Sequence, residues 1–92
     1  MKKMKASSEV LTAHLAGEAV LLNLADKSYY RLNETAAFVW AEIEKGATRE
    51  DILAQILATY EIGEDRAADE LDAVLEDLTS RNLVSMAGAE ER

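Results

Sequence analysis

Few side chains in this sequence have the types and spacing that catalysis needs. The single histidine, His14, stands without a neighbouring catalytic partner, and a lone histidine is usually structural. Cysteine is absent, which excludes a thiol nucleophile, a disulfide framework and a thiolate metal site. The serines lie outside any G-x-S-x-G elbow, and the glycines are too scattered to form a phosphate-binding loop. The inventory therefore predicts a protein that is not an enzyme and binds no cofactor.

Carboxylates are the one abundant group with reactive chemistry. Asp65, Asp69, Asp72 and Glu76 recur three or four residues apart, which places them on neighbouring turns of a helix. Such a row can chelate a hard cation weakly, but this spacing is more typical of a solvated helix face. We therefore expect no metal site. The net charge of −8 also opposes contacts with phosphates, so nucleic acid is not an expected partner.

The length and the hydropathy pattern predict one small domain. A chain of 92 residues has room for a single modest core. No apolar run approaches the roughly 20 residues that a membrane helix needs, and the basic start is not followed by the apolar segment of a secretory signal. We expect flexible tails over residues 1–9 and 86–92 and one domain over residues 10–85. A cytoplasmic location, with no membrane partner, fits the absence of cysteine.

The first third of the chain has the pattern of β-strands. In the stretch "GEAVLLNLADKSYYRL", Val20, Leu22 and Leu24 alternate with residues of the opposite face, which predicts a hairpin. Residues 10–16 can form an extended segment before it. In the segment 28–32, "SYYRL", alternate side chains again point to opposite faces. We therefore expect three antiparallel strands.

From Asn33 the period becomes helical. Asn33 is a good N-cap, and Gly46 is a good residue to end the first helix. Thr48 predicts the start of a second helix, with Asp51 three residues on completing a capping-box-like pair. A third helix is expected over residues 64–80, and the segment after it is a candidate for a short strand. The predicted fold is α+β and winged-helix-like, with a three-stranded antiparallel sheet followed by three helices.

The predicted fold leaves several functions open. A winged-helix DNA-binding regulator is one, but its third helix would be strongly acidic and would be repelled by a phosphate backbone. An acyl carrier protein would need an attachment serine at the start of a helix, whereas Ser28 lies before a strand. An acidic subunit that docks on another protein without any peptide ligand also remains possible.

The segment "SYYRL" suggests a further function, the binding of a peptide. It contains no proline or glycine and only one charge, so little in it blocks pairing with another strand if it lies at a sheet edge. A partner segment could then add to it as an extra strand, through backbone hydrogen bonds. The alternative is that Tyr30 and Leu32 only pack against the helices, and that Tyr29 is an ordinary exposed aromatic residue.

Over residues 10–84 the chain resembles the small peptide chaperones typified by pyrroloquinoline quinone biosynthesis protein D, also called RiPP recognition elements. The resemblance rests on "YRLNETAAFVW" (residues 30–40), "KGATREDI" (residues 45–52) and "YEIGEDRAADELDAVLEDLTSRNLV" (residues 60–84). Taken together these segments are characteristic, although each is largely structural. Members of the family bind the leader of a ribosomally made precursor peptide and present its core to a modifying enzyme.

The resemblance implies where the leader peptide binds. The leader pairs beside the third strand, and its side chains enter a groove between that strand and the third helix. The acidic residues would line the rim of the groove and attract basic leader residues. The peptide-binding residues expected in this way are Ser28, Tyr29, Tyr30, Arg31, Leu32, Ala68, Asp69, Leu71, Asp72, Leu75 and Glu76. For Leu71 and Leu75 the alternative, a place purely in the core, is equally open.

The resemblance also implies a second partner, a separate enzyme that processes the bound peptide. Stand-alone members of this size are similar to the leader-binding proteins of lasso-peptide systems, in which a separate peptidase removes the leader. Other members serve radical SAM enzymes. We favour the lasso-type system on the size of the chain and the overall character of the sequence.

Overall fold

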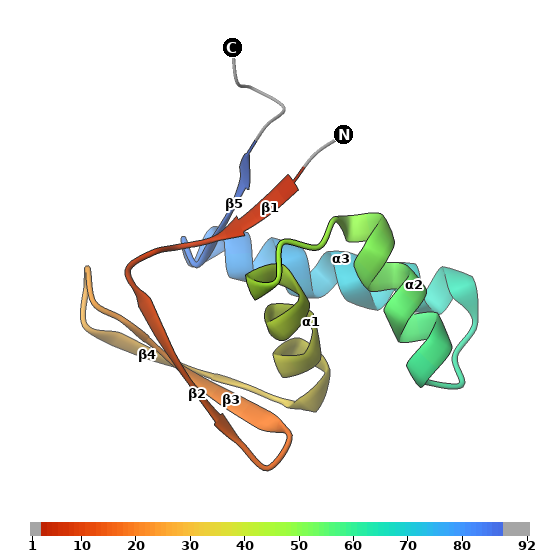
Figure 1. The fold of residues 1–92 in the computed structure, drawn as a ribbon, viewed down its shortest axis with the longest axis horizontal. Helices are drawn as coiled ribbons and strands as arrows, with labels where there is room; N and C mark the ends of the chain where they lie inside the picture. The colour runs from red at the N-terminus through yellow and green to blue at the C-terminus, as the bar shows by residue number, and fades with distance from the viewer. Residues whose placement is uncertain (1–2, 88–92) are drawn as a thin grey trace.

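The computed structural model describes residues 3–87 and has the predicted α+β architecture (Figure 1). A three-stranded antiparallel sheet is followed by three helices, as the sequence predicts. A separate two-stranded ribbon joins the two ends of the described chain. The elements are β1 (Lys3–Ala6), β2 (Val10–Leu15), β3 (Glu18–Asn23), β4 (Ser28–Leu32), α1 (Glu34–Glu44), α2 (Arg49–Thr59), α3 (Glu64–Ser80) and β5 (Val84–Ala87).

The larger sheet has the strand order β2-β3-β4 and is built from two hairpins. Ala16 and Gly17, both with positive φ (48° and 86°), form the two-residue turn between β2 and β3. The polar turn between β3 and β4 is held by Asn23, whose Oδ1 accepts the amide of Ala25 at 2.9 Å. Among residues 3–87, β4 pairs only with β3, so it is an edge strand of this sheet.

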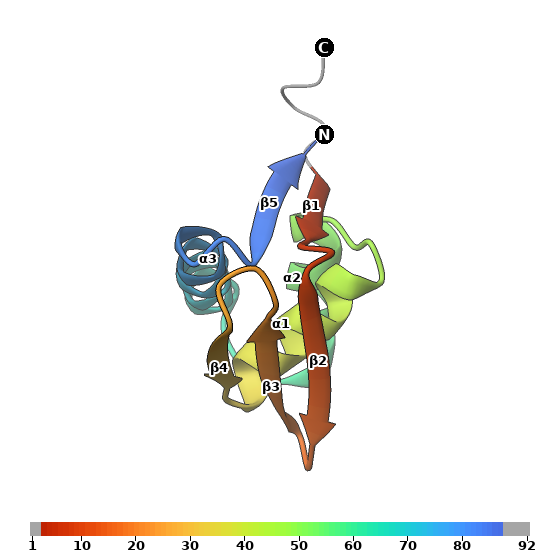
Figure 2. The same ribbon diagram turned by 90° about the vertical axis from the view of Figure 1, so that its left-hand side faces the viewer.

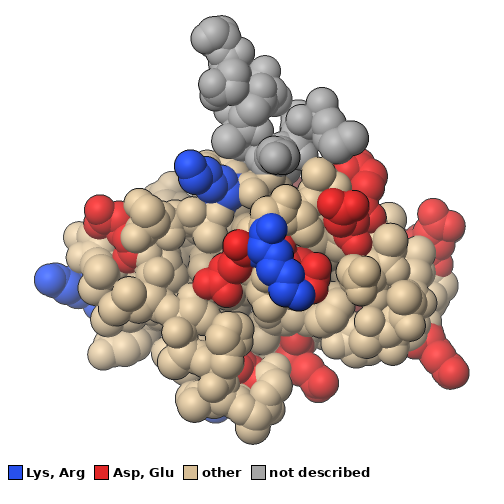
Figure 3. Space-filling view, viewed as in Figure 1, with Lys and Arg blue, Asp and Glu red and all other residues tan. Residues whose placement is uncertain are grey.

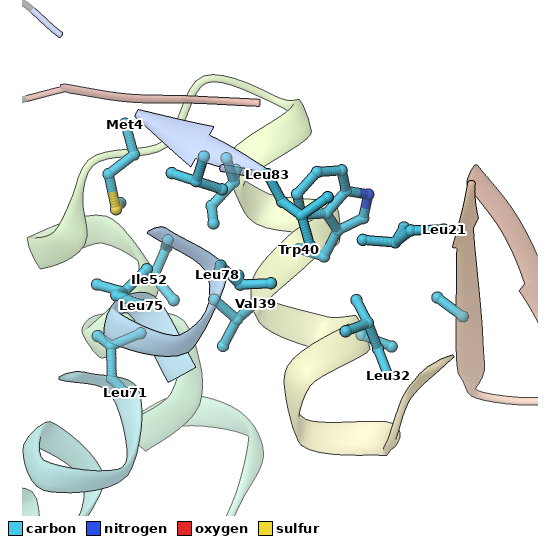
Figure 4. Packing of buried hydrophobic residues seen from close by; sticks show 14 of the residues in the cluster. Met4, Leu21, Leu32, Val39, Trp40, Ile52, Leu71, Leu75, Leu78 and Leu83 are labelled. Carbon is cyan, nitrogen blue, oxygen red and sulfur yellow. The ribbon is translucent and has the colours of Figure 1, made fainter. Parts of the chain in front are cut away.

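Helix α1 covers one face of the sheet. It begins at Asn33, whose side chain accepts the amide of Ala36 at 2.9 Å, as the capping rule predicts. Its Trp40 is buried and donates a hydrogen bond from Nε1 to Thr12 Oγ1 at 3.0 Å, which ties the helix to β2. Figure 4 shows the indole of Trp40 lying toward Leu21 of β3. The sheet therefore has one covered face and one open face.

Helices α2 and α3 complete the core on the other side of α1. Helix α2 begins with the predicted capping box, in which Thr48 and Asp51 each accept the other's amide. Helix α3 buries Leu71, Leu75 and Leu78 against α1 and α2 (Figure 4). No helix within residues 3–87 is long and apolar enough to span a membrane.

The structure differs from the expected tails at both ends. Lys3–Ala6 lie within the expected tail 1–9 but pair as β1 with β5, and Met4 is buried with 3% of its surface exposed. Met86 and Ala87, within the expected tail 86–92, belong to β5. A short strand with a single large apolar residue is recognisable only with its partner, which lies at the far end of the chain. Residues 1–2 and 88–92 lie outside the described part, and the boundaries of the expected domain stay a prediction.

Candidate functional site

The hydrogen-bond pattern of the sheet determines which backbone groups lie free at the edge of β4. In a two-residue hairpin the residues that flank the turn, here Leu15 and Glu18, are hydrogen-bonded to each other, and such pairs then alternate along the strands. The amide of Leu24 donates to Glu9 O at 2.8 Å, which continues the same alternation past the end of the strands. Every second residue of β3, beginning with Glu18, therefore bonds to β2.

The remaining residues of β3 turn their amides toward β4. Ala19 is paired with Leu32 and Leu21 with Tyr30, so these are the hydrogen-bonded pairs of β3 and β4. Tyr29 and Arg31 then direct their N–H and C=O groups away from the sheet. The alternation of side chains in the sequence does not show which amides of β4 point outward, whereas the register of the strands does. These two residues offer the donors and acceptors that an added strand needs.

A groove runs along this edge, between β4 and α3. It has a volume of about 560 Å³, and the two elements that form its walls are neighbours in Figure 2. Its apolar surface comes from β4, the start of α1 and one side of α3, and charged side chains stand at its margins. The lining residues are Arg31, Leu32, Asn33, Thr35, Ala36, Glu70, Ala73, Val74, Asp77 and Leu78.

Ion pairs hold the charged side chains at the margins of the groove. The guanidinium of Arg81 lies 5.0 Å from the centre of the Tyr30 ring and donates from Nε to Asp77 Oδ1 at 3.0 Å. This contact joins the end of α3 to the inward face of β4. Glu70 accepts a hydrogen bond from Arg66 at 3.2 Å, one turn before it. Arg31 reaches Glu18 on β3 at 3.2 Å.

The structure places part of the expected site at the groove and part elsewhere. Arg31 and Leu32 of β4 line it, Tyr30 lies next to it, and the free amides belong to Tyr29 and Arg31. On α3, by contrast, Leu71 and Leu75 are buried in the core, with 1% and 6% of their surface exposed. Neither lines this groove, although Leu71 borders the neighbouring depression at the start of α1 and Leu75 borders a separate one.

The acidic residues expected at the rim lie on another side of α3. Asp72 accepts two hydrogen bonds from Arg49 of α2, at 2.7 and 3.0 Å. The hydrogen bond from Arg49 lowers the pKa of Asp72, against a smaller opposing effect of burial, and the same bond raises the pKa of Arg49. Glu76 lies with this pair in a separate depression. Asp69 is exposed and Ala68 is half-buried, and neither lines the groove.

The residues of α3 that the sequence interpretation missed are Glu70, Ala73, Val74, Asp77 and Leu78. Because each residue turns a helix by about 100°, a shift of one or two positions selects a different face. Val74 carries the signal that could have found this face, since it is a large apolar residue at the margin of the buried stripe. It is half-buried in the structure and lines the groove beside the small side chain of Ala73.

A second depression continues the groove around the start of α1. It has a volume of about 350 Å³ and shares Thr35 and Glu70 with the groove. Tyr60 and Ile62, from the connection between α2 and α3, give it an apolar surface. The described residues form no cluster of three or more potential metal ligands. The groove and this depression together extend from β4 to the connection between α2 and α3.

A comparison with protein families shows to which family this chain belongs. The sequence profile of Coenzyme PQQ synthesis protein D (PqqD) matches residues 18–84, which include the hairpin of β3 and β4, the three helices and the first residue of β5. The chain belongs to the PqqD family. In this PqqD-family protein the matched region contains the edge strand, the groove and the start of α1 that closes one end of it.

Solved structures resemble this PqqD-family protein over nearly its whole length. "TbiB1 in Complex with the TbiA(beta) Leader Peptide" has 29% sequence identity and a TM-score of 0.84, over 95% of this chain and 99% of that one. "Lasso peptide synthetase B1 complexed with the leader peptide" has 22% identity and a TM-score of 0.80, over 89% and 96%.

A larger protein contains the same fold as one part. The heterocyclase TruD matches with 14% identity and a TM-score of 0.70, over 100% of this chain but only 12% of its own. This likeness, like that to the lasso peptide synthetase, concerns the fold alone. The search of curated proteins finds no match.

Proposed function

We propose that this PqqD-family protein is a non-catalytic adaptor that binds the leader segment of a ribosomally made precursor peptide. The leader adds to β4 as a fourth strand of the sheet. The observation that carries this proposal is the free edge of β4, whose outward amides at Tyr29 and Arg31 lie along the groove beside α3. The likeness to TbiB1, which was solved in complex with a leader peptide, supports the same ligand class.

Strand addition fits the dimensions and chemistry of the groove. An added strand lies about 4.7–4.9 Å from its neighbour, and its alternate side chains point to the same face as Tyr30 and Leu32. Those side chains would enter the groove and contact Val74 and Ala73, above the buried Leu78. One apolar anchor seated there would provide most of the affinity, with the backbone bonds fixing register.

The charged margins of the groove add selectivity. Glu70 and Asp77 stand on the α3 side, and Arg31 stands on the β4 side. A leader with basic residues opposite α3 would be attracted before contact, which raises the association rate more than the affinity. The peptide-binding roles first expected for Ala68, Asp69, Asp72 and Glu76 stay a prediction. Variants of Asp69 and Glu76, described below, test these roles separately from that of the groove.

In this function the adaptor delivers its peptide to a separate enzyme. A leader peptidase of a lasso-peptide system is the partner that we favour, and a radical SAM enzyme is the alternative. Because precursor peptides are made on ribosomes, we expect the protein to act in the cytoplasm. Its groove would hold the leader while the core segment extends toward the enzyme.

Fluorescence anisotropy tests the proposal directly. A labelled leader peptide, from the precursor gene beside this one, would be titrated with the protein, next to a scrambled leader and a DNA duplex. We expect saturable binding of the leader only. Duplex binding that weakens steeply with salt would instead favour a winged-helix regulator. Binding of none of the three would favour a docking subunit without a peptide ligand.

A further inference from the structure

The face of the sheet opposite α1 is apolar, and no described element of the chain covers it. On β3 the buried residues Ala19, Leu21 and Asn23 point toward α1, so Val20 and Leu22 between them point outward. The residues opposite Val20 and Leu22 on β2 and β4 point outward with them. Leu11 and Leu15 of β2 are 56% and 57% exposed, and Tyr29 of β4 is 73% exposed. A solvated sheet face ordinarily carries polar residues at these positions. Exposed apolar patches of this kind mark interaction surfaces.

The large side chains of this outer face form a row across the strands. Leu11 is opposite Leu22, and Leu22 is opposite Tyr29, so one continuous row crosses β2, β3 and β4. The row ends at the same edge whose amides are free. A strand added to β4 would therefore continue it with an outward side chain of its own.

The outer face is also almost neutral, although the protein is strongly acidic. Its charged side chains, Glu18 and Arg31, form an ion pair at 3.2 Å. Figure 3 shows acidic side chains spread over the helical part of the molecule. Two copies of a chain with a net charge of −8 repel each other, which disfavours a dimer built on this face. The face is suited to a different protein with an apolar, uncharged docking surface.

We infer that the outer face of β2, β3 and β4 is the docking surface for the enzyme that acts on the bound peptide. This inference rests on the proposed function for the identity of that enzyme. The row from Leu11 to Tyr29 and the added peptide strand form one continuous surface. The enzyme therefore contacts adaptor and peptide together and binds the loaded adaptor more tightly than the empty one.

The double variant Leu11→Thr/Leu15→Thr tests this inference. Both residues lie on β2, at the sheet edge away from the groove, and threonine retains a high β-propensity. The probe is the peptide-processing enzyme encoded beside the precursor gene, immobilised for biolayer interferometry with and without saturating leader. We expect its affinity for the variant to fall at least tenfold, while the anisotropy Kd for the leader stays within twofold. Circular dichroism would confirm that the sheet is retained.

A matched control is Ala54→Ser/Ala58→Ser, which places hydroxyl groups on the exposed side of α2 and should change neither measurement. Undiminished enzyme binding by the Leu11/Leu15 variant, or no enzyme binding by the unmodified protein, would overturn the inference. So would sedimentation of the unmodified protein as a dimer that the variant dissociates, because the occupant would then be a second copy. An unmodified protein that binds the enzyme through this face but not the leader would overturn only the proposed function.

Discussion

Val74 is the single side chain that best separates the groove from the rest of α3. It is half-buried and lines the groove with Leu32 and Leu78. Replacing it with glutamate places a charge between Glu70 and Asp77, where an apolar leader side chain would sit. We expect Val74→Glu to weaken leader binding at least tenfold in the anisotropy titration, because hot-spot contacts of this kind dominate small interfaces.

The matched controls for Val74 are Asp69→Asn and Glu76→Gln, on the side of α3 away from the groove. Both should leave the leader Kd within twofold. If instead these two variants lose binding and Val74→Glu does not, the peptide lies along the acidic side of α3. The first expectation from the sequence would then be right and the groove assignment wrong.

Asp72 has a structural role that pH can reveal. Its bond to Arg49 lowers its pKa from the ordinary value of 3.8, so the pair stabilises the folded state above that pH and loses its effect as the pH falls through the folded-state pKa. Because both side chains are partly exposed, the effect is screened. We expect Asp72→Asn to cost about 0.5 kcal/mol in urea unfolding at pH 7. The cost should be constant down to about pH 5 and shrink below pH 4. A cost that persists unchanged in strong acid would contradict this assignment.

At the scale of the element, β4 is defined by the direction of its amides. Arg31 turns its N–H outward, whereas Tyr30 donates to β3. Proline is tolerated at an edge strand when the N–H that it removes faces solvent. We therefore expect Arg31→Pro to abolish leader binding and to retain the fold, whereas Tyr30→Pro removes a ladder hydrogen bond and lowers the melting temperature.

The control for the proline variant is Arg31→Ala, which removes the ion pair with Glu18 but keeps the amide. It should retain most of the leader affinity. Thermal melts followed by circular dichroism would run beside each titration. An Arg31→Pro protein that binds the leader normally would show that the peptide does not pair with this edge.

The elements show how far the sequence alone could predict this site. Local signals identified the hairpin strands and the helix starts at Asn33 and Thr48, because alternation and capping depend on neighbouring residues. The side of α3 that lines the groove was harder to predict from the sequence. Its apolar stripe is wide, and the packing of Leu71, Leu75 and Leu78 against α1 and α2 determines which margin turns toward β4. The direction of the β4 amides required the register, which the turn at Ala16 and Gly17 sets.

At the scale of the whole molecule, β1 and β5 pair as a two-stranded ribbon, a contact that no local sequence pattern predicts. The pairing joins residues from the two ends of the chain, and the amide of Ser7 donates to Leu83 O at 2.9 Å just beyond it. Leu83 and Val84 follow α3 after a two-residue turn and are buried in the same core as Met4. The ribbon thus fastens the end of α3, from which Arg81 reaches Tyr30 at the groove.

Met4→Ala tests how much the ribbon of β1 and β5 stabilises the whole domain. Met4 is 3% exposed, and truncating a buried methionine leaves a cavity that typically costs about 2 kcal/mol or more. We expect a loss of this size in urea unfolding, whereas Lys5→Ala, at the exposed neighbouring position, should change stability little. Because the ribbon holds the end of α3, amide exchange should quicken first around Leu83. A variant as stable as the unmodified protein would show that residues 3–6 are the loose tail that their sequence suggests.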